Sequence, residues 1–93
     1  MKYTILVLSA LVVTIAGCAG NPNSSIANQC ENGLSTAYEE LDYANSKGFG
    51  GTVEYTKAAS LLGAAKIQSE FGKYPNCIDK VNRARAYIKK SQK

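Results

Sequence analysis

From residue 24 onward, apolar side chains recur at spacings of three and four, and no stretch alternates apolar with polar residues as a half-buried strand does. These positions fall into three runs, which predict helices at about 24–46, 52–71 and 75–91. The apolar positions are Ile26, Cys30, Leu34, Ala37, Tyr38 and Leu41, then Ala58, Leu61, Leu62, Ala65 and Phe71, then Cys77, Ile78, Val81, Ala84 and Ile88. The predicted fold class is all-α, a three-helix bundle with up-down-up topology.

Residues at the ends of the three runs are those that start and stop helices. Ser24 or Ser25 suits the N-cap of the first helix and Thr52 that of the second. Gly48 suits a left-handed C-cap, and Pro75 is tolerated at the first helical position. The second run is crowded with small side chains, so we expect its helix to be approached closely and to form the centre of the domain.

The beginning of the chain has a different pattern. Lys2 adds a positive charge, and an apolar run of about 12 residues follows, from Ile5 to Ala16. A membrane-spanning helix needs about 20 such residues, whereas a run of this length is typical of a signal peptide. The run ends in Ile15-Ala16-Gly17-Cys18, which resembles the lipobox of bacterial lipoproteins.

That resemblance implies a location and a modification. Residues 1–17 would be a cleaved signal peptide, and Cys18 would carry a thioether-linked diacylglycerol and an N-acyl chain as a membrane anchor. Ala19 stands where lipoproteins retained in the inner membrane commonly have Asp, so the resemblance implies the periplasmic face of the outer membrane. Residues 18–23 would then be a short flexible tether, and residues 24–93 the only domain.

Two further cysteines, Cys30 and Cys77, remain in a compartment that permits disulfides. A bridge between them would stabilise the fold by about 4 kcal/mol in the chain-entropy treatment. A redox-active pair is the alternative, but there is no Cys-x-x-Cys spacing and no basic neighbour to activate a thiol. We expect a structural disulfide, which requires the first and third helices to run parallel.

A second resemblance covers residues 58–91. The turn Gly72-Lys73-Tyr74-Pro75-Asn76 and the positions of Cys77, Val81 and Ala84 resemble a tetratricopeptide-repeat hairpin. The resemblance implies repeat-like packing of two helices, but not a binding array, since an array needs at least three repeats. The same region resembles small helical lipoproteins, a likeness that implies no activity.

Composition argues against catalysis. The chain has no His, which excludes imidazole acid–base chemistry and His-ligated zinc or haem, and we expect neither a metal nor a cofactor apart from the lipid on Cys18. Glu39 and Glu40 leave a helix about 100° apart, so they cannot flank one bond. A Ser60–Lys57 pair is conceivable from spacing alone, but a bundle this small offers no deep pocket. We expect a protein that is not an enzyme.

Charge and tyrosine content suggest an interaction surface instead. The chain has 11 Lys and Arg against 7 Asp and Glu, a formal net charge of +4, and its last helix is basic while its first is acidic. The charges either complement one another in packing and stabilise a helix C-terminus, or contact an anionic surface. Tyr43 and Tyr87 lie off the apolar stripes. The candidate interaction surface is Arg83, Arg85, Tyr87, Lys89, Lys90, Phe49 and Tyr43.

These features favour a lipid-anchored interaction or structural module of the cell envelope. Its partners would be the membrane and an envelope protein, lipopolysaccharide or peptidoglycan; nucleic acid is disfavoured by location, and the oligomeric state is open. The alternative is a protein-binding or inhibitor module that faces the periplasm and grips its partner through Phe49 and the glycine-rich loop Gly48–Gly51. We expect the Phe49 ring to fold back over the end of the bundle.

Overall fold

A computed structural model describes residues 24–93, so Cys18 and the expected signal and tether lie outside the described residues. The domain consists of α2 (Ser25–Ser46), α3 (Val53–Glu70) and α4 (Tyr74–Ser91). The predicted helices agree with these bounds to within a residue. Within the described range there is no strand, and none of the helices has the length and apolar character needed to cross a membrane.

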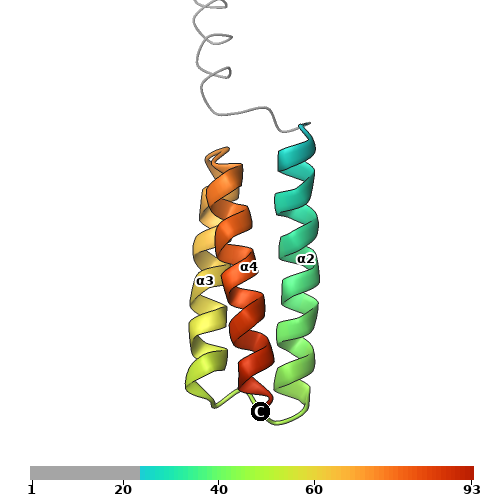
Figure 1. Cartoon of the computed structure of the whole chain (residues 1–93), viewed down its shortest axis with the longest axis vertical. Coiled ribbons are helices and arrows are strands. Elements are labelled where there is room, and N and C mark those ends of the chain that lie inside the picture. Colours follow the sequence, from blue (N-terminus) through green and yellow to red (C-terminus); the bar gives the residue numbers. More distant parts are fainter. Residues whose placement is uncertain (1–23) are drawn as a thin grey trace, which may run out of the picture.

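The three helices form an up-down-up bundle, as predicted (Figure 1). Short turns reverse the chain after α2 and again after α3, so α2 and α4 run parallel and α3 runs antiparallel to both. The start of α2, the end of α3 and the start of α4 share one end of the bundle, which we call the tether end because Ser24 lies there. The glycine-rich loop and Lys93 lie at the opposite end.

Local interactions fix where each helix begins and ends. The Ser24 hydroxyl oxygen accepts a hydrogen bond from the Ala27 N–H at 3.1 Å, and that of Thr52 accepts one from the Tyr55 N–H at 3.1 Å. Gly48, with φ of 93°, and Gly72, with φ of 72°, adopt the left-handed conformation in which an L side chain is strained. The sequence predicted both caps and the role of Gly48.

The core is a single apolar cluster along the axis of the bundle. Leu62 and Ile88 are the largest side chains that are almost fully buried. Three predicted core positions are wrong: Ile26 is 45% exposed, Tyr38 is 36% exposed and Phe71 is 67% exposed. The buried stripe of α2 keeps the predicted Cys30 and Leu34 but passes through Ala27 and Ala44 at its two ends, so Ile26 lies about 100° away from it. The buried cluster comprises Cys30, Leu34, Ala37, Leu41, Ala44, Ala58, Leu62, Ala65, Cys77, Val81, Ala84 and Ile88.

The central helix is α4, rather than α3 as the small side chains predicted. It packs extensively on both neighbours, whereas α2 and α3 contact each other least. The glycine that permits close approach is Gly33 on α2, where an added Cβ would lie 3.1 Å from Val81 Cγ1. At Gly63 on α3, an added Cβ would meet nothing within 4 Å. Ala58 and Ala65 of the small-residue stretch are buried, whereas Gly63 lies on the open side of α3.

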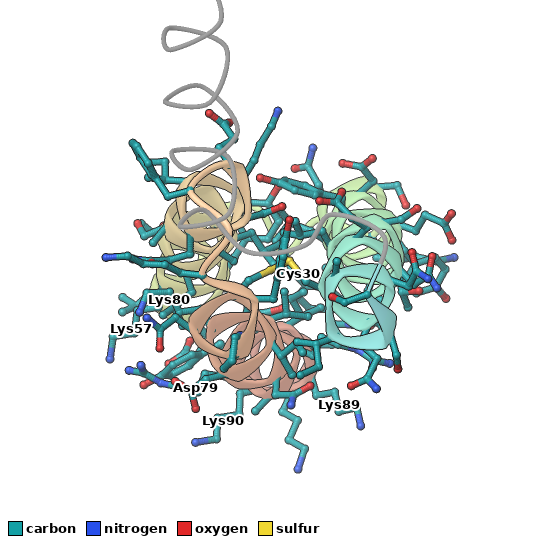
Figure 2. The ribbon with its side chains drawn as sticks, turned by 90° about the horizontal axis from the view of Figure 1, so that it is seen from above. Cys30, Lys57, Asp79, Lys80, Lys89 and Lys90 are labelled. Carbon is teal, nitrogen blue, oxygen red and sulfur yellow. A yellow bond between two sulfur atoms is a disulfide. The ribbon has the colours of Figure 1, made fainter. Side chains whose placement is uncertain are left out.

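The disulfide between Cys30 and Cys77 is present and buried at the tether end (Figure 2). It joins α2 to α4 within the first two turns of each helix, where the Cα atoms of the two cysteines are 5.7 Å apart. Parallel α2 and α4 bring the two cysteines to the same level. The predicted pairing and the predicted topology are both confirmed.

Candidate functional site

Charge is divided unequally among the helices. α2 carries four acidic residues and no basic one, whereas α4 carries five basic residues and a single acidic one, Asp79. If this division served only to hold the bundle together, several ion pairs would join α2 to α4. Among residues 24–93 there is one such pair, between Arg85 and Glu40. Most of the positive charge of α4 is therefore not used in packing.

The Arg85–Glu40 pair is a two-pronged contact. Arg85 Nε donates to Glu40 Oε1 at 2.7 Å, and Arg85 Nη2 donates to Glu40 Oε2 at 3.1 Å. The hydrogen bond from Arg85 lowers the pKa of Glu40 below its usual value, and the charges of Arg85 and Lys89 lower it further, while partial burial opposes the shift. The pair joins α2 to α4 in the half of the bundle nearer the glycine-rich loop.

Replacing Arg85 by Gln should destabilise the domain by about 0.5–1 kcal/mol at neutral pH. The expected loss is small because the side chains of Arg85 and Glu40 are 39% and 34% exposed, so solvent screens their attraction. A carboxyl group whose pKa is lower in the folded state stabilises the fold above its unfolded pKa, near about 4.3 for Glu. That stability is lost as the pH falls through the lower folded value. Urea unfolding at pH 7 and in strong acid would measure the difference.

Arg83→Gln is the matched control for this prediction. Arg83 Nη1 lies 3.7 Å from Asp79 Oδ2 on the exposed side of the same helix, so its loss should change stability by only a few tenths of a kcal/mol. A loss in the Arg85→Gln protein that persists undiminished in strong acid would contradict the ion-pair explanation.

On the side of α4 that faces α3, cationic side chains surround one aromatic ring. Lys57 Nζ on α3 and Lys90 Nζ on α4 lie 5.4 and 5.5 Å from the centroid of the Tyr87 ring, distances at which a cation is attracted to the ring face. Lys80 and Arg83 occupy the preceding turns on the same side of α4. We call Lys57, Lys80, Arg83, Tyr87 and Lys90 the basic face (Figure 2).

A shallow pocket of about 260 Å³ opens within the basic face. Lys57 and Arg83 line it, together with Tyr87 and two hydroxyl residues, of which Thr56 already donates its hydrogen to the Thr52 carbonyl oxygen at 3.2 Å. Ammonium and guanidinium groups attract an anion, the remaining hydroxyl can donate a hydrogen bond to it, and an aromatic ring offers an apolar surface to a sugar or acyl group. The lining residues are Thr56, Lys57, Ser60, Leu61, Arg83 and Tyr87.

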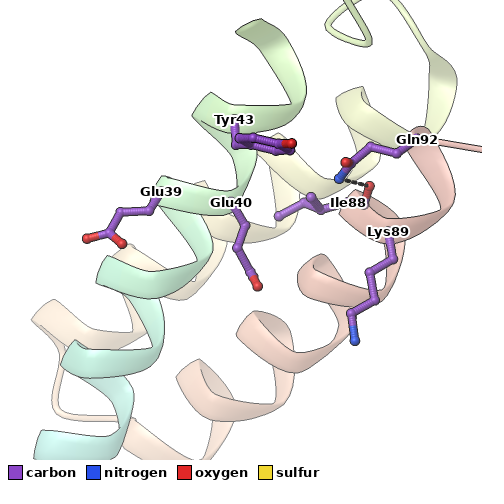
Figure 3. A pocket seen from close by; sticks show the side chains of 6 residues that line it. All are labelled: Glu39, Glu40, Tyr43, Ile88, Lys89 and Gln92. Carbon is purple, nitrogen blue, oxygen red and sulfur yellow. Dashed lines mark hydrogen bonds between the residues drawn. The ribbon is translucent and has the colours of Figure 1, made fainter. Parts of the chain in front are cut away.

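A second groove, of about 350 Å³, lies between α2 and α4 (Figure 3). Tyr43 is 56% exposed and covers one side of it, while Lys89 stands on the opposite wall. Gln92 donates from Nε2 to the Ile88 carbonyl oxygen at 3.3 Å. Because Glu39 and Glu40 line it as well as Lys89, the groove has mixed charge and attracts neither sign strongly.

The structure does not bring the predicted interaction residues into one surface. Arg83, Tyr87 and Lys90 belong to the basic face, whereas Tyr43 and Lys89 belong to the groove between α2 and α4. Arg85 is engaged by Glu40. Phe49 packs against the core at the end of the bundle, as expected, which leaves less of its ring for a partner.

Sequence reasoning missed Lys57 as a member of this surface. Lys57 lies 30 residues before Tyr87, and only the antiparallel packing of α3 on α4 brings the two together. The spacing of Lys57 and Ser60 had suggested a nucleophile and base, but no hydrogen bond joins them among the described residues; Lys57 lies over the Tyr87 ring instead. Residues 24–93 also contain no group of three potential metal ligands.

Comparison with protein families, with curated proteins and with solved structures found no match to this chain. Function is therefore inferred from the residues of the bundle and from their arrangement.

Proposed function

We propose that this protein is a lipid-anchored module of the bacterial cell envelope that binds anionic envelope components through its basic face. Support for the anchor is the sequence Ile15-Ala16-Gly17-Cys18 after an apolar run. One observation carries the binding role. Within residues 24–93, Arg85 pairs with Glu40 on α2 and Arg83 pairs with Asp79 on its own helix, so three of the five cations on α4 have no ion pair and carry charge that the fold does not use.

The chemistry of the basic face favours an anionic polymer or glycolipid. Lys57, Arg83 and Lys90 present positive charge around Tyr87 over adjoining turns of two helices. A molecule with many anionic groups can contact several of these cations at once; lipopolysaccharide offers phosphates and peptidoglycan offers carboxylates. Each lysine near such a surface contributes about 1 kcal/mol of binding free energy. The Tyr87 ring suits the apolar face of a sugar between the charged groups.

Binding of the purified domain to isolated peptidoglycan and to lipopolysaccharide-containing vesicles tests this proposal. The double variant Lys57→Gln/Lys90→Gln should bind about 20- to 30-fold more weakly than the wild-type protein, the effect of two lysines at about 1 kcal/mol each. Binding by the wild-type protein should also weaken steeply between low and moderate salt, because exposed charges are screened.

The matched control is Lys47→Gln/Lys93→Gln. It removes the same charge, and Lys47 likewise lies over a tyrosine, with its Nζ 5.4 Å from the centroid of the Tyr43 ring. Equal weakening by both double variants would show that net charge alone attracts the ligand. Binding that is indifferent to salt and to Lys57 and Lys90 would contradict the proposal and favour the loop around Phe49.

A further inference from the structure

The tether end of the bundle exposes apolar side chains that its core does not need. The described residues include four large exposed side chains that are branched aliphatic or phenyl, and three of them lie at this end. Ile26 is 45% exposed in the first turn of α2, while Ile67 and Phe71 are 54% and 67% exposed on successive turns at the end of α3. The fourth, Val53, starts α3 at the opposite end. Scattered apolar residues are ordinary on a surface, but a concentration at one end marks a contact site.

The outward position of Phe71 follows from the register of α3. Phe71 lies nine residues after buried Leu62, which is two and a half turns and therefore the opposite side of the helix. Gly72, in the left-handed conformation, then ends the helix, with its N–H donating to the Ser69 carbonyl at 3.1 Å. The Phe71 ring cannot join the core without breaking this turn.

The short chain between Cys18 and the bundle limits how far the tether end can lie from the proposed anchor. Five residues lie between Cys18 and Ser24, so the chain from one to the other spans at most about 20 Å. Ser24 lies at the same end of the bundle as Phe71. If Cys18 carries lipid, the tether end is held beside the membrane surface, and the opposite end is farther away by the length of α3, about 27 Å for 18 residues.

We infer that the tether end rests in the interface of the membrane that holds the anchor, with Ile26, Ile67 and Phe71 inserted among the lipid headgroups. This inference rests on the proposed lipid anchor. Amphipathic surfaces of this kind insert their apolar side chains at the boundary between headgroups and acyl chains. The bundle then stands on the membrane. Lys57 and Lys90, the members of the basic face farthest from the tether end, lie away from the membrane and toward the periplasm.

Charge plays little part in this contact. Lys66 and Lys73 lie near the tether end, but Glu31 and Glu70 lie there too. The contact should therefore persist in salt that abolishes binding through the basic face, because burial of apolar surface is not screened.

The chain contains no Trp, so a single tryptophan gives an unambiguous signal. The test compares Phe71→Trp with Val53→Trp in the lipidated full-length protein, reconstituted in vesicles that contain brominated phospholipids. These positions are a matched pair: they are 67% and 64% exposed, and they lie 18 residues apart, five full turns, on one side of α3. Quenching by the brominated lipids should be at least roughly threefold greater for Phe71→Trp and unchanged by high salt.

Other outcomes of this quenching experiment would overturn either the inference or the anchor on which it rests. Equal quenching at the two positions, or none at either in protein that floats with the vesicles, would overturn the inference while leaving the anchor intact. A blue shift at both positions without quenching, increasing with the ratio of protein to lipid, would show that a second copy covers α3 and would also overturn it. Protein that does not float with the vesicles would refute the anchor, and the inference with it.

Discussion

Replacing both Cys30 and Cys77 by Ala should lower the free energy of unfolding by about 4 kcal/mol or more, since the chain-entropy treatment assigns that cost to releasing a loop of this size and the variant also loses packed sulfur atoms. The bridge spans a sequence separation of 47 residues and holds together the first two turns of α2 and α4. For a domain of this size, such a loss corresponds to a melting temperature lower by about 15–30 °C. Thermal unfolding followed by circular dichroism would measure it.

Reduction of the wild-type protein is the control that distinguishes the contribution of the covalent bond from that of the packed sulfur atoms. Both cysteines are fully buried, so the double alanine variant also loses packing volume, whereas the reduced protein keeps it. The reduced protein should therefore fall between the oxidised protein and the variant. Identical unfolding curves for the oxidised and reduced proteins would contradict a stabilising role for the bridge.

Replacing Cys18 by Ser should transfer the protein from the membrane fraction to the soluble periplasmic fraction. A hydroxyl group does not take the place of the thiol that forms the thioether, and each acyl methylene withdrawn from the bilayer costs about 0.8 kcal/mol of membrane affinity. Exporting the variant behind a general secretory signal ensures that residues 1–17 do not themselves hold it in the membrane. Fractionation and the intact mass of the protein would report the outcome.

Ala19→Ser is the matched control, because it keeps Cys18 and adds only a hydroxyl beside it; this protein should stay in the membrane fraction. Native protein whose mass shows an unmodified Cys18, or a Cys18→Ser protein that remains in the membrane after its signal has been removed, would contradict the anchor.

The sequence was sufficient for the helices and their order because the signals that define them are local. Thr52 caps α3 with its own hydroxyl, and Gly48 ends the preceding turn through a conformation that few other residues adopt. Pairing of Cys30 with Cys77 followed from there being two cysteines in the predicted domain, and it required the parallel α2 and α4 that up-down-up topology provides.

Details of the surface could not be predicted where neighbouring positions both suited the core. Ile26 and Ala27 are adjacent on α2, and the buried stripe that contains Cys30 passes through Ala27, which leaves Ile26 exposed. The same limitation applies to charge. Periodicity places Arg83 and Arg85 on one basic helix, but only the packed bundle shows that Arg85 meets Glu40 while Arg83 lines the pocket beside Tyr87.

The position of the disulfide also determines how the domain carries mechanical load. Tension applied at Ser24 and resisted by a ligand held on α4 passes through the first six residues of α2, across the Cys30–Cys77 bond and directly into α4. The remainder of α2 and the whole of α3 lie outside that path. Helix packing alone would let such a pull peel α2 from the bundle one turn at a time, whereas here the force is borne by a covalent bond.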